Sequence, residues 1–445
     1  MIRLTLAEVA QIVGGTLDGD DADVTGPAFV DSRAVEPDGL FVAFAGERVD
    51  GHEYAARAVA EGAAGVLGSR PTGVPTVVVD DVQVALQTLA REVLVRRRAR
   101  GPLDVVAITG SQGKTSAKDM LARVLSESAE TVATYGSFNN EIGLPLTVLR
   151  VEELTRYLVL EMGARGIGHL TELCAIAPPD VAMVLNVGRA HLGEFGSRDA
   201  IARAKGELVE ALGTDGVAVL NADDPRVAAM AARTRAAVWT FGRGDDATVR
   251  IRDVVLDDLG RPGFDLTHDT VTQHVQLGVL GEHHVGNAAA AVTAAIAVGV
   301  PFPAAVTALA KVTTLSKWRM ELVEAPSGLR IVNEAYNANP DSMRDALETL
   351  AAIGNRTGAP TAAVLGEMLE LGESSAEEHR AIGALVRELR IDHLVVVGDG
   401  ARGILDGAAG WGSPLHAVDV RAAVDLVRET VPASSVVLVK ASRGA

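Results

Sequence analysis

Short apolar runs alternate with stretches of helical periodicity through the middle of the chain. Apolar runs that fit buried strands fall at 103–108, 157–161, 181–186 and 216–220. Helical patterns lie between them, as at 117–126 and 199–212. Strands that alternate with helices form a mainly parallel sheet with helices on both faces. We therefore expect an α/β fold here, with ligands bound at the carboxyl ends of the strands.

The two ends of the chain show the same alternation over shorter elements. At the N-terminus we expect an amphipathic helix over 1–15, with a capping box formed by Thr5 and Glu8 and an end at Gly14. Further strands are expected at 29–33, 39–44, 65–67 and 76–79, and in the C-terminal part at 329–333, 361–365, 392–397 and 435–439.

Two breaks in the pattern divide the chain. A helix expected over 83–100 ends at Gly101-Pro102, and a hinge is expected near 315–321. We predict three α/β domains: a small N-terminal domain with the linking helix (1–100), a central domain (101–318) and a C-terminal domain (319–445). The last is Rossmann-like in outline but lacks a Gly-x-Gly-x-x-Gly turn, so no nicotinamide site is predicted.

Composition and charge exclude several classes of protein. Of the 445 residues 48% are hydrophobic, which excludes a disordered chain, and the net charge of −17 disfavours a general nucleic-acid binder. No apolar run reaches the roughly 18 residues that a membrane span needs. A single cysteine allows no intrachain disulfide and fits a reducing compartment. We expect a soluble cytoplasmic protein.

Three residue groups are interpreted as structural. The basic run 96–100 fits a solvated helix end, where cations complement the helix dipole. Cys174 lies in an apolar helix and is expected in the core. His283-His284 has no partner at metal-ligand spacing, so we interpret it as a polar loop or a helix start.

The clearest chemical signal follows the strand expected at 103–108. It reads Thr109-Gly110-Ser111-Gln112-Gly113-Lys114-Thr115-Ser116. In a strand-to-helix turn, glycines let backbone N–H groups surround phosphates, the lysine can reach the outer phosphates and the Thr115 hydroxyl suits Mg²⁺. Ile108 stands where a strict Walker A pattern has glycine, so a plain glycine-rich turn is the alternative. We predict a nucleotide-binding loop.

Three further polar residues lie at or near expected strand ends. Glu161 closes the strand at 157–161, His191 follows the strand at 181–186, and Lys205 lies on the helix after it. Thr115 and Glu161 could hold one Mg²⁺ against the β- and γ-phosphates. Taken alone, His191 is more often a structural histidine, and Lys205 a phosphate contact or a surface lysine. A lysine becomes a metal ligand only after CO₂ converts it to a carbamate.

Together with segments 136–147, 161–164 and 336–343, these motifs resemble the Mur ligase family of ATP-dependent amide ligases. The family's nucleotide loop reads Thr-Gly-Ser/Thr-x-Gly-Lys-Thr, which residues 109–115 fit, and the resemblance covers all three expected domains. The segment Tyr336-Asn337-Ala338-Asn339-Pro340 resembles the branch that adds a dipeptide. The Asp-Asn-Pro-Arg motif of the sister branch, which adds the third peptide residue, does not occur.

The resemblance implies a reaction and its partners. It implies a UDP-binding N-terminal domain, an ATPase-like central domain, and a C-terminal domain that closes over the nucleotide and holds the acceptor. It also implies the joining of D-alanyl-D-alanine to the terminal carboxylate of UDP-N-acetylmuramoyl-tripeptide through an acyl phosphate, in cytoplasmic peptidoglycan precursor synthesis. ATP and two Mg²⁺ ions would be required, and a monomer is expected. The alternatives are a sister ligase adding one amino acid, a non-catalytic nucleotide-binding regulator, and a kinase-like phosphotransferase.

The resemblance also implies roles for residues around the nucleotide. Lys114 and Thr115 would bind the phosphates and Mg²⁺, Glu161 and His191 would be metal ligands, and Lys205 would be carbamylated. Other implied ATP contacts are the rest of the loop 109–116, Asn287 on adenine, Arg319 from the hinge, and Glu334 on the ribose. Glu334 departs from the family's usual aspartate, and His284 replaces a common asparagine.

Substrate contacts complete the implied site. For the UDP-linked substrate they are Ser32, Arg33, Asp50, His52, Asn139 and Asn140. On the acceptor side they are Tyr336, Asn337, Asn339, Lys440 and Ser442. Viewed without the family, Asp31-Ser32-Arg33, Asp50-Gly51-His52 and Asn139-Asn140 are typical turn sequences, and Asn339-Pro340 is typical of a helix start.

Overall fold

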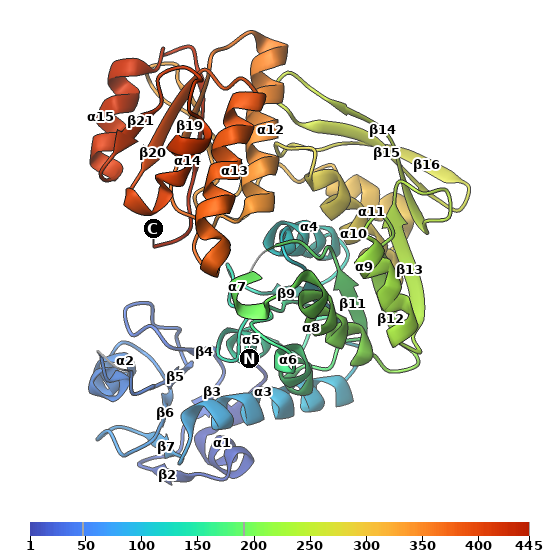
Figure 1. The fold of residues 1–445 in the computed structure, drawn as a ribbon. Helices are drawn as coiled ribbons and strands as arrows, with labels where there is room; N and C mark the ends of the chain where they lie inside the picture. The colour runs from blue at the N-terminus through green and yellow to red at the C-terminus, as the bar shows by residue number, and fades with distance from the viewer. Residues whose placement is uncertain (47–48, 190–191, 445) are drawn as a thin grey trace.

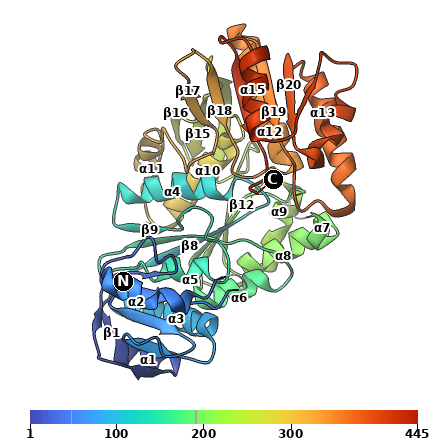
Figure 2. The same ribbon diagram turned by 90° about the vertical axis from the view of Figure 1, so that its left-hand side faces the viewer.

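The computed structural model describes residues 1–46, 49–189 and 192–444. Figure 1 shows the N-terminal part in blue, the middle in cyan to yellow and the C-terminal part in orange to red, and Figure 2 shows them as three tiers. The described strands form four sheets, of two, nine, six and five strands. Each sheet falls inside one of the three expected domain ranges.

The central sheet has nine strands in the order β16-β15-β14-β13-β12-β11-β8-β10-β9. They are β8 Asp104–Thr109, β9 Thr131–Ala133, β10 Tyr157–Glu161, β11 Val181–Val184, β12 Val217–Asn221, β13 Ala237–Gly242, β14 Val249–Leu256, β15 Pro262–His268 and β16 Val271–Gln276. Strands β8 to β14 pair in parallel, which confirms the predicted mainly parallel sheet, although β9, β13 and β14 were not among the predicted strands. Strands β15 and β16 add an antiparallel edge that was not predicted.

Helices cover both faces of this sheet, which confirms the α/β prediction. They are α4 Lys114–Ser126, α5 Gly143–Val148, α6 His169–Ile176, α7 Leu192–Phe195, α8 Arg198–Glu210, α9 Pro225–Ala228, α10 His284–Ala297 and α11 Phe302–Leu309. Successive side chains of β8 enter different cores: Val105 and Ala107 pack with α5, α6 and α8, and Val106 and Ile108 with α4 and α10.

The N-terminal part packs on one of these cores through the helix that links it to the central sheet. Its elements are β1 Leu4–Thr5, α1 Leu6–Val13, β2 Thr16–Asp18, β3 Asp23–Val24, β4 Ala28–Phe29, β5 Leu40–Val42, the 3₁₀ turn η1 Gly51–Tyr54, α2 Ala55–Ala60, β6 Gly65–Gly68, β7 Thr76–Val78 and α3 Val82–Ala99. Leu86 and Leu89 of α3 share a core with Leu6 of α1 and Leu146 of α5.

Three local predictions here need correction. The first helix begins at Leu6 rather than at residue 1, because Leu4 and Thr5 pair with β3, although the Thr5–Glu8 capping box and the end at Gly14 are confirmed. Strand 29–33 ends at Phe29, because the chain turns at 31–33. The basic run is not fully solvated, because buried Arg97 donates to four backbone carbonyls around the start of β8.

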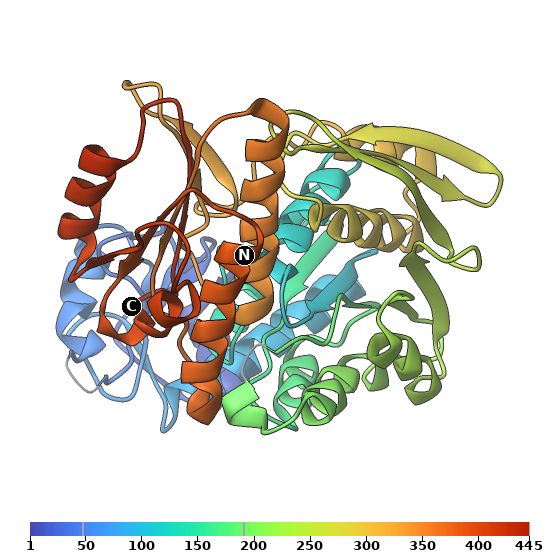
Figure 3. The ribbon, with the colours of Figure 1, turned by 45° about the horizontal axis from the view of Figure 1, so that its top comes forward.

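The C-terminal sheet has six strands in the order β17-β18-β22-β19-β20-β21, of which only β17 is antiparallel. They are β17 Glu321–Glu324, β18 Arg330–Asn333, β19 Thr361–Leu365, β20 His393–Val397, β21 Leu415–Ala417 and β22 Val436–Lys440. The helices are α12 Pro340–Thr357, α13 Ser375–Glu388, α14 Gly403–Gly407 and α15 Val420–Thr430. Figure 3 shows α12 on the side of this sheet that faces the central part. Among the described residues, no helix has the length and apolar character needed to cross a membrane.

Candidate functional site

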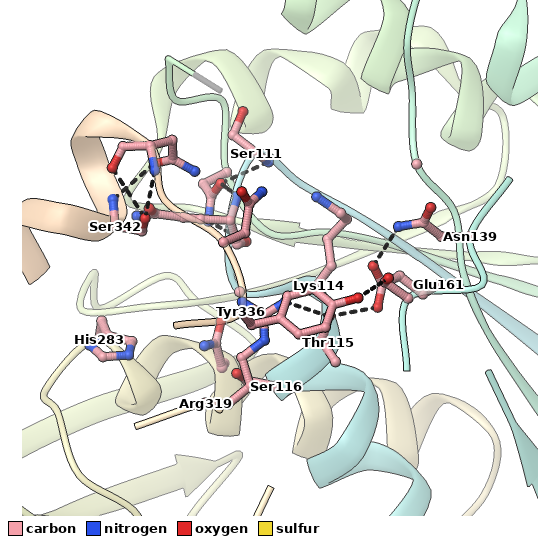
Figure 4. Close-up of a pocket in the computed structure, with 18 of the residues that line it drawn as sticks. Ser111, Lys114, Thr115, Ser116, Asn139, Glu161, His283, Arg319, Tyr336 and Ser342 are labelled. Carbon is pink, nitrogen blue, oxygen red and sulfur yellow. Dashed lines mark hydrogen bonds between the residues drawn. The ribbon is translucent and has the colours of Figure 1, made fainter. Parts of the chain in front are cut away.

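One cavity of about 280 Å³ lies between the carboxyl edge of the central sheet and loops of the C-terminal part. The loops after β8, β10 and β11 line it from one side, and residues 319–320 of the predicted hinge and the loop before α12 line it from the other. Figure 4 shows side chains from both parts pointing toward one another across it. Carboxyl ends of parallel strands are where α/β proteins bind ligands, so the position agrees with the prediction.

The predicted phosphate loop is a strand-turn-helix, as expected. Strand β8 ends at Thr109 and α4 begins at Lys114, with Gly113 before it at a φ of 78°. Asn186 stabilises the turn, because its Oδ1 accepts hydrogen bonds from the backbone N–H groups of Ser111 and Gln112 at 3.0 Å each. A Cβ on Gly113 would lie 2.5 Å from Asn287 Oδ1, so this position requires glycine for space as well as for its φ.

Lys114, Thr115 and Glu161 meet at the floor of the cavity. Lys114 Nζ donates to the Gly110 carbonyl at 2.7 Å, and burial lowers the pKa of this ammonium. The Thr115 hydroxyl donates to Glu161 Oε2 at 2.9 Å, while Asn139 Nδ2 donates to the other carboxylate oxygen at 2.7 Å. Figure 4 shows the two bonds to Glu161 as dashed lines. A phosphate-sized anion at this floor would meet one cation, one hydroxyl and the N-terminus of α4.

The same floor offers oxygen ligands of the kind that Mg²⁺ prefers. Thr115 Oγ1 and Glu161 Oε2 are adjacent and buried, so both can ligate one ion. Within the described ranges no group of three His, Cys, Asp or Glu side chains surrounds a metal position. The residues therefore fit an ion whose remaining ligands come from phosphates and water. His191 lies outside the described residues, so its metal role stays a prediction.

Lys205 of α8 lies in the same cavity, 3% exposed. Among the described residues, nothing accepts a hydrogen bond from its amine. Burial lowers its pKa well below the ordinary value, and the nearby Lys114 lowers it further. Both effects favour the neutral amine. Lys205 therefore lies buried in the cavity and is not the surface lysine that its helix position allowed.

Two histidines and Asn287 line another part of the cavity, where α10 begins. His283 precedes the helix and His284 is its first residue, which confirms the predicted helix start. Their ring centroids lie 4.1 Å apart with the ring planes tilted by 49°, and His284 Nδ1 lies 3.3 Å from Asn287 Nδ2. Burial lowers both histidine pKa values, and His283 Nδ1 and His284 Nε2 have no partner in the described structure. Asn287 was predicted as an adenine contact and His284 as a departure at that contact, and both line the cavity; the structural interpretation of His283 missed its place in the same lining.

The C-terminal part contacts the central part through Arg319, Tyr336 and Asp345. Arg319 Nη2 donates to Thr115 Oγ1 at 3.2 Å, and its guanidinium lies 4.3 Å from the centre of the Tyr336 ring. The Tyr336 hydroxyl bonds to the Ser137 hydroxyl of the central part. A third link joins Gln112 of the loop to Asp345 of α12 at 3.1 Å, and Asp345 was not predicted.

The remaining acceptor-side residues divide into two groups. Asn337 and Asn339 line the cavity, and Asn339 also caps α12 through a capping box with Ser342, which confirms the predicted helix start. Lys440 and Ser442 are buried behind this loop and do not line the cavity: Lys440 Nζ donates to the Asn337 carbonyl at 2.9 Å, and Ser442 Oγ to the Ala338 carbonyl at 3.1 Å. Their contacts in the structure support the loop.

The residues predicted for the UDP end lie in the N-terminal part, outside this cavity. Buried His52 donates from Nδ1 to Asp50 at 2.6 Å and accepts the Ser69 N–H at Nε2 at 2.9 Å. The His52 hydrogen bond lowers the pKa of Asp50 to about 2. Ser32 is buried, and exposed Arg33 pairs with Asp31 at 2.8 Å.

Asn140 lies on the central side of the cavity. Its Oδ1 accepts the Gly143 N–H at 2.8 Å, next to the start of α5, and the residue also lines the cavity beside Asn139. The structure therefore brings the predicted nucleotide and peptide residues together, and leaves the predicted uridine residues in a separate tier.

Three family models match the chain. The description "Mur ligase family, catalytic domain" fits residues 29–100, "Mur ligase middle domain" fits 108–295, and "Mur ligase, glutamate ligase domain" fits 318–443. Together they span all three parts of the structure.

Full-length relatives carry one shared name. The chain is 44% identical to UDP-N-acetylmuramoyl-tripeptide–D-alanyl-D-alanine ligase of Mycobacterium tuberculosis (strain ATCC 25618 / H37Rv), covering 100% of this chain and 96% of that one. It is 36% identical to the Bacillus subtilis (strain 168) protein of that name, with the same coverage. Solved structures agree: MurF from Acinetobacter baumannii (33% identical, TM-score 0.86, 99% and 96% covered) and MurF from Thermotoga maritima in complex with ADP (31% identical, TM-score 0.79, 94% and 95% covered).

Proposed function

The chain belongs to the Mur ligase family, and from this premise we propose that it joins D-alanyl-D-alanine to the terminal carboxylate of UDP-N-acetylmuramoyl-tripeptide at the expense of ATP. The product would be the UDP-linked pentapeptide used in peptidoglycan synthesis. The observation that carries the proposal is the single cavity in which the phosphate loop, Glu161 and Lys205 face the loop 336–339 of another part of the chain.

ATP would place its phosphates against the loop 109–116. The N-terminus of α4 and Lys114 supply positive charge there, and Arg319 reaches the same point from the hinge. Asn287 and His284 line the part of the cavity that would receive adenine. The tripeptide carboxylate then attacks the γ-phosphorus, the bond to the β-phosphate oxygen breaks, and ADP leaves with that electron pair. These cations stabilise the charge on the moving phosphoryl group.

Thr115 and Glu161 would hold Mg²⁺, which would neutralise phosphate charge when bound. We further propose that Lys205 takes up CO₂ as a carbamate and so becomes an anionic oxygen ligand for a second ion. Its burial supports this, because only a neutral amine adds to CO₂, and the proton leaves as the N–C bond forms. His191 keeps its predicted role as a further ligand on the strength of the family alone.

The second half of the reaction uses the opposite wall. The amine of D-alanyl-D-alanine attacks the acyl carbon of the acyl phosphate, and phosphate leaves with the electrons of the C–O bond. Tyr336, Asn337 and Asn339 line the wall that would hold the dipeptide, and Lys440 and Ser442 would keep that loop in place. The links from Tyr336 and Asp345 to the central part would exclude water, which would hydrolyse the intermediate.

The N-terminal part would hold the far end of the substrate. We propose Ser32, Arg33, Asp50 and His52 for the UDP group, and Asn139 and Asn140 for the muramoyl peptide. We place the reaction in the cytoplasm, where ATP is available. A monomer is also proposed, since all the residues invoked belong to one chain.

The test supplies the purified chain with ATP, Mg²⁺, UDP-N-acetylmuramoyl-tripeptide labelled with ¹⁸O in its terminal carboxylate, and D-alanyl-D-alanine. The expected result is ADP release, UDP-pentapeptide by mass spectrometry, and one ¹⁸O atom in the inorganic phosphate, because the acyl phosphate passes a carboxylate oxygen to phosphate. The control variant is Ser126→Ala, which changes an exposed residue at the end of α4 and should leave turnover unchanged.

Three outcomes would contradict the proposal. Turnover with a single amino acid in place of the dipeptide would indicate the sister activity. A stable phosphorylated product without an amide would indicate a phosphotransferase. Nucleotide binding without ADP release under any substrate combination would indicate a regulator.

A further inference from the structure

The hinge holds Arg319 between two residues in an unfavourable backbone conformation. Trp318 has a φ of 63° and Met320 a φ of 49°, both in the left-handed region that favours glycine. Side-chain sterics make this conformation costly for both residues, so surrounding contacts must fix it. The contacts around 318–320 therefore decide where Arg319 points.

The described structure gives each strained residue one carboxylate partner for its backbone N–H. The Trp318 N–H donates to Glu321 Oε2 at 3.2 Å, but both residues are exposed. The Met320 N–H donates to Glu334 Oε2, and both of these residues are buried. A buried hydrogen bond to a charged group contributes more than an exposed one, so Glu334 is the stronger anchor.

The other oxygen of Glu334 is also engaged. Its Oε1 lies 3.4 Å from Lys440 Nζ and 3.9 Å from Arg319 Nη1. The Glu334 backbone N–H donates to the Val439 carbonyl at 2.9 Å, which fixes Glu334 at the carboxyl ends of β18 and β22. This carboxylate therefore connects the sheet of the C-terminal part to the hinge.

We propose that Glu334 is a positioning residue that clamps the hinge at Met320 and thereby directs Arg319 onto Thr115 and the Tyr336 ring. The inference rests on the proposed function and extends it, since the family resemblance assigns this position to the ribose. The length of the side chain matters: Glu334→Asp would withdraw the carboxylate by about 1.5 Å, one C–C bond, and the Met320 N–H would lose its acceptor.

The test compares Glu334→Asp, which keeps the charge, with Glu334→Gln, which keeps an acceptor oxygen at full length. Steady-state rates are measured with ATP, 2′-deoxy-ATP and 3′-deoxy-ATP. A hinge clamp predicts a kcat about tenfold lower in Glu334→Asp, the loss expected for one charged hydrogen bond, and a smaller loss in Glu334→Gln. The preference for ATP over either deoxy-nucleotide stays unchanged in both variants. Glu321→Gln, at the exposed anchor, is the matched control and changes kcat less than twofold.

Hydrogen exchange at the Met320 amide gives a second readout that does not depend on activity. The clamp predicts faster exchange in Glu334→Asp than in the wild-type chain, and near-wild-type exchange in Glu334→Gln and Glu321→Gln. Collapse of the preference for ATP over a deoxy-nucleotide, with Met320 exchange unchanged, would overturn the proposal in favour of a ribose contact. A wild-type chain without ligase activity would refute the proposed function, while the exchange result would still decide the clamp.

Discussion

The two walls of the cavity are built in different ways. On the central side, Lys114, Thr115, Glu161 and Lys205 lie on or next to regular strands and helices, and hydrogen bonds within that sheet's own loops position the turn. On the C-terminal side, Arg319, Tyr336 and Asn337 lie in connecting segments. Their positions depend on side-chain contacts, several of them made across the cavity. The first wall is fixed by local structure, and the second is completed only when the two parts meet.

This difference predicts unequal effects of mutation. Substitutions on the central wall should abolish the chemistry and leave the arrangement of the parts intact. Substitutions at the contacts across the cavity should lower the rate moderately and loosen that arrangement. Four experiments test this comparison, in order of decreasing expected effect.

Lys114→Ala should have the largest effect. It removes a buried cation from the phosphate loop, and loss of one such group costs about 10²–10³ in kcat, or roughly 3–4 kcal/mol. The measurement is ADP release with all substrates, with thermal unfolding to show that the fold is retained. Wild-type activity in this variant would refute the assignment of the loop.

The contrast between the walls also explains which elements could be predicted from the sequence. The phosphate loop and β10 were predicted at their observed positions, because strand, turn and helix signals there are local. Strands β14 to β16 were missed, since polar residues interrupt the apolar residues in each of them and none has the continuous apolar pattern of a buried strand. Strands β17 and β21 were missed as well: β17 is exposed along its length and β21 is three residues long.

Contacts between distant residues set the limit for the site. Asp345 meets Gln112 across 233 positions, and neither residue carries a motif that names the other. Likewise, the burial of Lys440 and Ser442 behind the loop 336–339 depends on β22 lying beside β18, which local patterns do not specify. The family resemblance proposed roles for these residues, but only the fold distinguishes a wall residue from a supporting one.

Lys205→Ala should have the second largest effect, about a hundredfold in kcat if the lysine supplies an anionic ligand. Formate or acetate added at millimolar concentration should restore part of the activity, because the truncated side chain leaves room for a small carboxylate. Lys311→Ala, which removes an exposed ion pair with Glu127, is the control variant. Neither formate nor acetate should change its activity. Failure of rescue in a folded variant would favour a plain lysine that contacts phosphate.

Tyr336→Phe tests the contact across the cavity. It removes the hydroxyl that bonds to Ser137 and keeps the ring under Arg319, so we expect a loss of up to about tenfold in kcat, the range for one hydrogen bond. Ser137→Ala should cause a similar loss, and the double variant no more than either single one. Additive losses would show that the two hydroxyls act independently.

Asp345→Asn should have the smallest effect on rate and a pH-dependent effect on stability. Burial raises the pKa of Asp345, so the folded chain binds its proton more readily than the unfolded chain does. Its charged form therefore destabilises the fold at neutral pH, and this cost disappears as the pH falls through the raised pKa toward the ordinary value of 3.8. The amide introduced by Asp345→Asn can also donate to Gln112 Oε1, which has no partner among the described residues. Thermal unfolding should show the variant more stable than the wild-type chain at pH 7, with the difference shrinking toward pH 4. If the difference in stability between the variant and the wild-type chain did not depend on pH, the charged carboxylate of Asp345 would not destabilise the fold. The contact with Gln112 would then fully offset the cost of its burial.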